Sequence, residues 1–133
     1  MIPEFGDNGY LPPGVYAASL DEIAERFGSQ SDVRRAEMES LRWLVPLTRG
    51  AGVKRLIING SFVTNVDEPN DVDCVLLTDE NYPRDQLLHR ELVRGLPFLE
   101  IKFVVQDAFD DYVNSVFGTD RDLVPKGMIE VFL

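Results

Sequence analysis

The chain has 133 residues, 44% hydrophobic and 27% charged, which is typical of one folded domain over residues 1–133. Its net charge of -10 argues against long nucleic-acid contacts, because these depend on Lys and Arg that neutralise phosphates. A single cysteine, no signal-peptide pattern and no apolar run of membrane-spanning length favour a cytoplasmic protein without membrane contact.

The N-terminal segment predicts an irregular arm followed by a short helix. Residues 1–18 contain Pro and Gly too often for a regular element, and their apolar side chains are expected to hold the arm against the domain. Ser19 and Glu22 have the spacing of a capping box, which predicts a helix that begins there and ends near Gly28.

A longer helix is predicted next. It begins at a cap formed by Ser31 or Asp32 and reaches about Arg49, because apolar residues recur at helical spacing. Pro46 predicts a kink or an end within this helix. Trp43 is expected to lie in the core.

The rest of the chain alternates between strand and helix patterns. This alternation predicts an α/β (α+β) domain with a mixed central sheet of about four strands flanked by helices. The predicted strands span residues 54–59, 71–77, 98–105 and 127–133, and the predicted helices span 84–94 and 108–117.

Two aspartates lie at the head of the second predicted strand. Because side chains alternate along a strand, Asp71 and Asp73 point to the same face, about 7 Å apart along the backbone. Strands disfavour Asp, so this pair favours a site for a hard cation such as Mg²⁺. The alternative is a solvated turn, since turns commonly carry Asp and Asn.

Two further features favour a ligand site near these aspartates. Gly60 and Ser61 follow the first predicted strand directly, where glycine allows close approach of a ligand and the hydroxyl and backbone N–H groups can bind phosphate. Glu100 interrupts an apolar strand, so it is expected to bind metal, to pair with a basic residue or to lie at an edge. With Asp71 and Asp73 it would form a three-carboxylate cluster able to hold two Mg²⁺ ions.

Six basic residues are candidates for phosphate contact, and the sequence does not select among them. They are Arg34, Arg35, Arg49, Lys54, Arg55 and Lys102.

This order of features resembles the DNA polymerase beta nucleotidyltransferase superfamily, in particular the minimal nucleotidyltransferases of bacteria and archaea. The resemblance covers about residues 31–105 and rests on a strand, Gly60-Ser61, a turn, Asp71-Val72-Asp73 and an acid-bearing strand. The segments 1–14 and 125–131 are similar to a bacterial nucleotidyltransferase-like branch of unknown function.

The resemblance implies a nucleotidyltransferase-like fold and Mg²⁺- or Mn²⁺-dependent transfer of a nucleotidyl group from a nucleoside triphosphate to a hydroxyl. Asp71, Asp73 and Glu100 would bind metal and act in catalysis, while Gly60 and Ser61 would contact the nucleotide. The resemblance also implies a toxin–antitoxin or phage-defence context with a partner protein. The acidic composition favours a protein or small-molecule acceptor over a long nucleic acid.

The chain departs from the minimal members in two ways, one of which is a loop to the first Asp that is about one residue shorter. The minimal members also carry Arg-Gly a few residues after Gly-Ser, where this chain has Thr64-Asn65. Loss of that arginine removes a phosphate contact. An alternative function is therefore a binding module that keeps the fold without catalysis, such as an antitoxin-like partner protein, and a plain interaction domain with solvated acids is a third.

Overall fold

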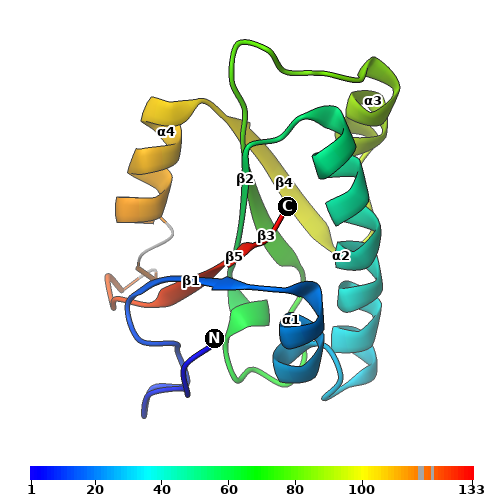
Figure 1. Cartoon of the computed structure of the whole chain (residues 1–133). Coiled ribbons are helices and arrows are strands. Elements are labelled where there is room, and N and C mark those ends of the chain that lie inside the picture. Colours follow the sequence, from blue (N-terminus) through cyan, green and yellow to red (C-terminus); the bar gives the residue numbers. More distant parts are fainter. Residues whose placement is uncertain (117–118, 121) are drawn as a thin grey trace.

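The computed structural model describes residues 1–116, 119–120 and 122–133, and it shows a mixed sheet with helices on both faces (Figure 1). The strands are β1 (Gly14–Ala18), β2 (Arg55–Asn59), β3 (Val72–Leu77), β4 (Leu99–Val104) and β5 (Gly127–Val131). The helices are α1 (Leu20–Phe27), α2 (Asp32–Ala51), α3 (Gln86–Arg94) and α4 (Gln106–Asp111), with a 3-10 turn η1 (Ser61–Val63) and a π-helical turn η2 (Tyr112–Val116).

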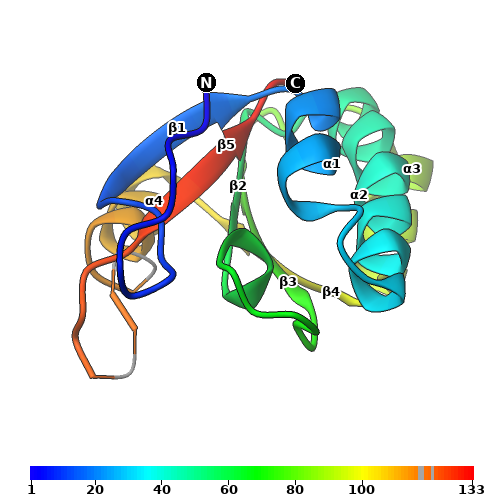
Figure 2. The same ribbon diagram turned by 90° about the horizontal axis from the view of Figure 1, so that it is seen from below.

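The five strands follow the spatial order β1-β5-β2-β3-β4. Strand β2 is antiparallel to both of its neighbours, whereas β1 runs parallel to β5 and β4 runs parallel to β3. Helices α1, α2 and α3 cover one face, and α4 covers the other (Figures 1 and 2). The predicted α/β (α+β) class with a mixed sheet is confirmed, with five strands where about four were expected.

The additional strand β1 lies in the segment predicted to be irregular. Gly14 to Ala18 pair with Gly127 to Val131 in a parallel register, so the prediction of an irregular arm over residues 1–18 is wrong for its last five residues. The local sequence is rich in Pro and Gly, but pairing with β5 determines the conformation of this edge strand. The preceding residues form the arm, and Leu11 anchors it in the core.

The first two helices follow their predicted caps. The Ser19 hydroxyl accepts from the Glu22 N–H at 3.2 Å, and the Ser19 N–H donates to the Glu22 carboxylate at 3.2 Å, which confirms the capping box. Helix α2 does not end at Pro46. It continues to Ala51 and stops at Gly52, whose φ of 94° is the left-handed conformation common after a helix C-terminus.

The last predicted helix, over residues 108–117, starts earlier than expected. Helix α4 begins at Gln106, and a π-helical turn follows it from Tyr112. Position 117 lies outside the described residues. Within the residues that the structure describes, no helix combines the length and apolar character needed to cross a bilayer.

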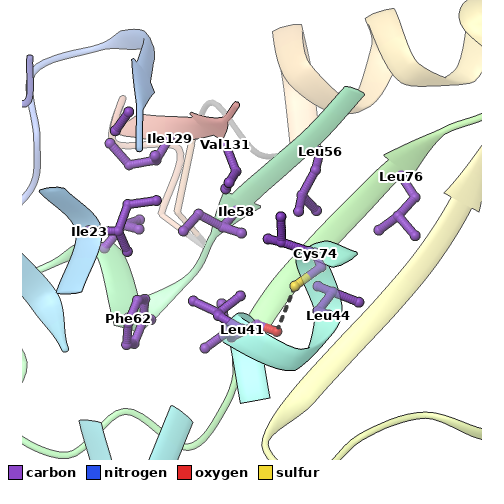
Figure 3. Close-up of a cluster of buried hydrophobic side chains, with 14 of the residues drawn as sticks. Ile23, Leu41, Leu44, Leu56, Ile58, Phe62, Cys74, Leu76, Ile129 and Val131 are labelled. Carbon is purple, nitrogen blue, oxygen red and sulfur yellow. Dashed lines mark hydrogen bonds between the residues drawn. The ribbon is translucent and has the colours of Figure 1, made fainter. Parts of the chain in front are cut away.

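Most of the core lies between the sheet and helices α1 and α2, where side chains from β2, β3 and β5 meet those of the helices (Figure 3). Cys74 is buried in this layer, and burial raises the pKa of its thiol. Trp43, expected in the core, is instead 44% exposed on α2. A smaller core lies under α4 and contains Ile57, Val75, Leu77, Phe109 and Met128.

The alternation along β3 positions the candidate site. Val72, Cys74 and Leu76 point into the larger core, so Asp73 points to the α4 face. The apolar end of this face is covered by α4, and Asp73 lies near its other end, next to the loop that leaves β2.

Candidate metal and phosphate site

Three carboxylates from neighbouring chain segments converge at the α4 face of the sheet. Asp73 lies on β3 directly opposite Glu100 on β4, and Asp71 immediately precedes β3. One carboxylate oxygen from each residue lies within 4.8 Å of the other two. The structure therefore brings together all three residues that the sequence marks as candidate metal ligands.

The electrostatic environment of the cluster is strongly negative. Burial, followed by repulsion from Glu100 and then Asp71, raises the pKa of Asp73 to about 6, and the nearby Lys126 opposes this shift. Within the described chain, none of the three acids forms an ion pair. Three convergent carboxylates that form no ion pair are the donor set that Mg²⁺ or Mn²⁺ accepts.

Gly60 connects this cluster to the turn that follows β2. Its φ of 83° and ψ of -164° belong to a region that is almost restricted to glycine. A Cβ at this position would lie 2.5 Å from the Asp73 Oδ2 atom. Glycine is therefore needed both for the backbone conformation and for the space that the carboxylate occupies.

Ser61 begins the 3-10 turn η1 directly after Gly60. Its side chain is exposed, and the hydroxyl has no hydrogen-bond partner among the described residues. The two residues predicted to contact a nucleotide thus lie beside the predicted metal ligands, with a hydroxyl available to a ligand.

Arg34 is not available for the phosphate contact for which the sequence made it a candidate. It is buried, and its guanidinium donates to backbone carbonyls within and just after η1, including those of Phe62 at 2.7 Å and Thr64 at 2.8 Å. It also donates to the carbonyls of Phe27 and Val66. Arg34 therefore fixes the turn from within the protein, a role that its sequence context does not reveal.

Glu37 lies one turn further along α2 and is fully buried. Neither of its carboxylate oxygens has a hydrogen-bond partner in the described part of the chain. Burial raises its pKa to about 7; Arg34 opposes the shift and Asp71 adds to it. A buried carboxylate in this position favours its neutral, protonated form.

A pocket of about 410 Å³ adjoins the turn. Its lining includes Tyr10, Gly60, Ser61, Thr64, Asp120 and Lys126. Gly60 lines the pocket and also lies directly beside the Asp73 carboxylate. The pocket and the carboxylate cluster are therefore adjacent. Lys126 lies just before the last predicted strand, and that position is the signal in the sequence that could have indicated a role for it.

Residues 3–132 match the model of a family described as a family of unknown function, DUF6932. The chain belongs to the DUF6932 family. Searches of curated proteins and of solved structures found no match.

The other candidate cations of this DUF6932 chain lie away from the pocket wall. Arg55 pairs with Glu130 at 2.6 Å, Lys54 pairs with Asp79 at 3.3 Å, and Lys102 lies over the Tyr112 ring. Arg35 contacts Asp32, and Arg49 is exposed on the last turn of α2.

Thr64 and Asn65 stand where Arg-Gly was expected. In this DUF6932 chain they form hydrogen bonds that hold the loop after η1 in place. The Thr64 hydroxyl donates to the Ser61 carbonyl at 2.7 Å, and Thr64 pairs with Tyr10 of the arm. The Asn65 N–H donates to the Gly9 carbonyl at 3.1 Å. These residues close the turn against the arm and bring no positive charge to the pocket.

Proposed function

We propose that this DUF6932 protein is a Mg²⁺- or Mn²⁺-dependent nucleotidyltransferase of the cytoplasm. It would move a nucleotidyl group from a nucleoside triphosphate to a hydroxyl of a protein, an RNA or a small molecule. The observation that carries the proposal is the convergence of Asp71, Asp73 and Glu100 beside the Gly60-Ser61 turn. The resemblance to minimal nucleotidyltransferases supports the same assignment.

Each residue has a role in this proposal. Asp71, Asp73 and Glu100 would hold a divalent ion, which would supply positive charge to the transferred and leaving phosphates. Glu100 is the exposed member of the three, so it is the carboxylate that an acceptor hydroxyl reaches and that takes its proton. Gly60 lets the phosphates approach the backbone, and the Ser61 hydroxyl donates to them.

The acceptor is proposed to be a protein or a small molecule. The net charge of -10 repels a long nucleic acid. A partner protein in a toxin–antitoxin or phage-defence pair fits this requirement, and it would present a hydroxyl to the exposed Glu100.

The test is transfer of label from α-labelled nucleotides. Each of the four nucleotides is incubated with the protein, Mg²⁺ or Mn²⁺, and protein or RNA fractions from the native host. Labelling is expected with wild type and is lost in Asp71→Asn/Asp73→Asn. The matched control is Asp107→Asn/Asp111→Asn, which removes the same charge from exposed positions of α4 and should label normally. Equal labelling by both double variants would exclude the carboxylate mechanism.

The alternative is a nucleotidyltransferase-like binding module without catalysis, such as an antitoxin-like partner protein. The structural role of Thr64 and Asn65 at the position of the expected Arg-Gly supports it. It predicts no label transfer with any nucleotide or metal, together with a stable complex between the protein and its partner that survives the Asp71→Asn/Asp73→Asn change.

A further inference from the structure

We propose that Lys126 binds the terminal phosphates of the nucleotide in the pocket beside the carboxylate cluster, in place of the arginine that the chain lacks. The inference rests on the proposed nucleotidyltransferase function and deepens it by naming the group that recognises the leaving pyrophosphate.

The register of the sheet brings Lys126 to the Gly60-Ser61 turn. Strands β2 and β5 are antiparallel, with Ile58 opposite Ile129, so the chain that leaves β2 lies beside the chain that enters β5. Both segments lie at the same end of the sheet (Figure 2). Lys126, Gly60 and Ser61 accordingly line one pocket. Among the described residues of its wall, Lys126 is the one with a positively charged side chain.

The ammonium group of Lys126 is available to a ligand. The residue is half-buried and forms no ion pair with any described residue. Burial lowers its pKa, whereas the negative charges of Asp73 and Asp120 raise it. A partly desolvated cation without a paired anion is stabilised when an anionic ligand enters the pocket.

Asp120, the acidic residue of the pocket wall, is already engaged. It accepts from the Tyr10 hydroxyl at 2.8 Å and from the N–H groups of Asp122 and Val124 at 2.8 and 2.9 Å. These donors offset its negative charge and fix the loop that leads to Lys126. Lys126 therefore remains without an ion-pair partner in the pocket, while the negative charge of Asp120 is stabilised by hydrogen bonds from Tyr10 and the loop backbone.

The position of Gly60 determines which phosphates reach Lys126. Gly60 lies between the carboxylate cluster and the pocket. In the proposed binding mode, the reacting phosphate lies at the carboxylates and the phosphate chain passes over Gly60 and Ser61. Its other end then lies in the pocket. The far end of a nucleoside triphosphate is the pyrophosphate unit that leaves on transfer. Inorganic pyrophosphate is therefore a direct probe.

The test is calorimetric titration of pyrophosphate into the protein in the presence of Mg²⁺. Lys126→Met should weaken binding by about tenfold to a hundredfold, the usual effect of removing one partner of a charge-assisted hydrogen bond. Lys126→Arg should restore binding to within about threefold, because it keeps the charge. Lys54→Met, which removes a lysine paired with Asp79 outside the pocket, should bind like wild type.

A second titration, with Mg²⁺ alone, separates this role from general damage to the site. Lys126→Met should bind the metal at least as tightly as wild type, because it removes a positive charge that acts on Asp73. Asp73→Asn should lose metal binding. Lower affinity for both ligands in Lys126→Met would mean that the lysine only supports the structure.

The inference is overturned if wild type does not bind pyrophosphate, or if Lys126→Met binds it equally well. Its failure is distinguishable from failure of the proposed function. If Lys126→Met transfers label with unchanged nucleotide affinity, the role of Lys126 is excluded but the proposed enzymatic function stands. If pyrophosphate binding depends on Lys126 but no label is transferred, the role of Lys126 stands and the binding module without catalysis is favoured.

Discussion

Asp73 and Glu100 lie directly opposite each other in the parallel register of β3 and β4. Like charges in facing positions destabilise a sheet by up to about 1 kcal/mol, and Asp71 adds a third negative group within the same cluster. The fold tolerates this repulsion because five other residue pairs in the register of β3 and β4 hold the two strands together on either side of it. A divalent cation would convert the repulsion into attraction, which leads to the first prediction.

Divalent metal should raise the thermal stability of the wild-type protein. At a free Mg²⁺ or Mn²⁺ concentration ten times Kd, the stabilisation is about 1.4 kcal/mol, which is a few degrees in Tm for a domain of this size. Asp71→Asn/Asp73→Asn should show no shift and should be more stable than wild type without metal, because repulsion is relieved. Differential scanning calorimetry with and without EDTA measures both effects, and an equal metal shift in this variant and in Asp107→Asn/Asp111→Asn would contradict the site.

Gly60→Ala should damage the metal site more than the fold. The new Cβ would lie 2.5 Å from the Asp73 carboxylate in addition to imposing a strained φ, so metal affinity should fall at least tenfold and stability by about 1–3 kcal/mol. Gly95→Ala is a matched control, since Gly95 has a similar φ of 85° and its added Cβ would meet no atom within 4 Å. The same loss of metal affinity in both variants would rule out the close contact as the cause.

Glu37 should make the stability of the metal-free protein depend on pH. Its pKa is about 7 in the folded chain against 4.5 for an ordinary glutamate, so between these values the folded state holds a proton that the unfolded state has released. Stability should therefore fall as pH rises from about 4.5 to about 7 and then remain at the lower level. Glu37→Gln should reduce this dependence to the part contributed by Asp73, whose pKa is also raised, and should be more stable than wild type at pH 8 by up to about 3 kcal/mol.

Urea denaturation in EDTA at several pH values measures the Glu37 effect. Glu39→Gln is the control, because Glu39 is exposed on the same helix and should leave the pH profile of wild type unchanged. A Glu37→Gln profile that follows wild type between pH 4.5 and 8 would show that Glu37 is ionised in the folded state.

Arg34 and Arg35 are adjacent in sequence but should respond very differently to substitution. Arg34→Met leaves several buried carbonyls around η1 without donors, so the free energy of unfolding should fall by about 3–5 kcal/mol. Arg35→Met removes an exposed pair with Asp32 and an exposed hydrogen bond to the Ser29 carbonyl, and it should change the free energy of unfolding by less than about 1 kcal/mol. Chemical denaturation of both variants compares them, and similar values would mean that the buried guanidinium does not hold the turn.

Features set by neighbours in sequence could be predicted. The reciprocal cap of Ser19 and Glu22 spans three residues, and the shared face of Asp71 and Asp73 follows from strand alternation. The position of Glu100 relative to Asp73 could not be predicted in the same way, because it depends on the parallel register of β3 and β4. The sequence could place it on a strand but could not fix that register.

Features set by distant partners could not be predicted. Strand β1 exists because it pairs with β5, more than a hundred residues away. Arg34 looked like any basic residue of a helix, and only the fold shows that its donors are used by carbonyls of another loop. Lys126 lies beside the Gly60-Ser61 turn because β2 and β5 pair in antiparallel fashion, and no local sequence pattern predicts that pairing.

The pairing of β1 with β5 also bears on how the protein is made. Strand β5 lies between β1 and β2, yet a ribosome synthesises it after all the other strands. Until it emerges, the nascent chain exposes the edge of β2, leaves β1 unpaired and has no strand that holds Lys126 beside the pocket. A chain that terminates before Gly127 keeps Asp71, Asp73 and Glu100, but its sheet has an unpaired edge that can pair with other chains. Premature products should therefore be substrates for chaperones and proteases and should not be partly active enzymes.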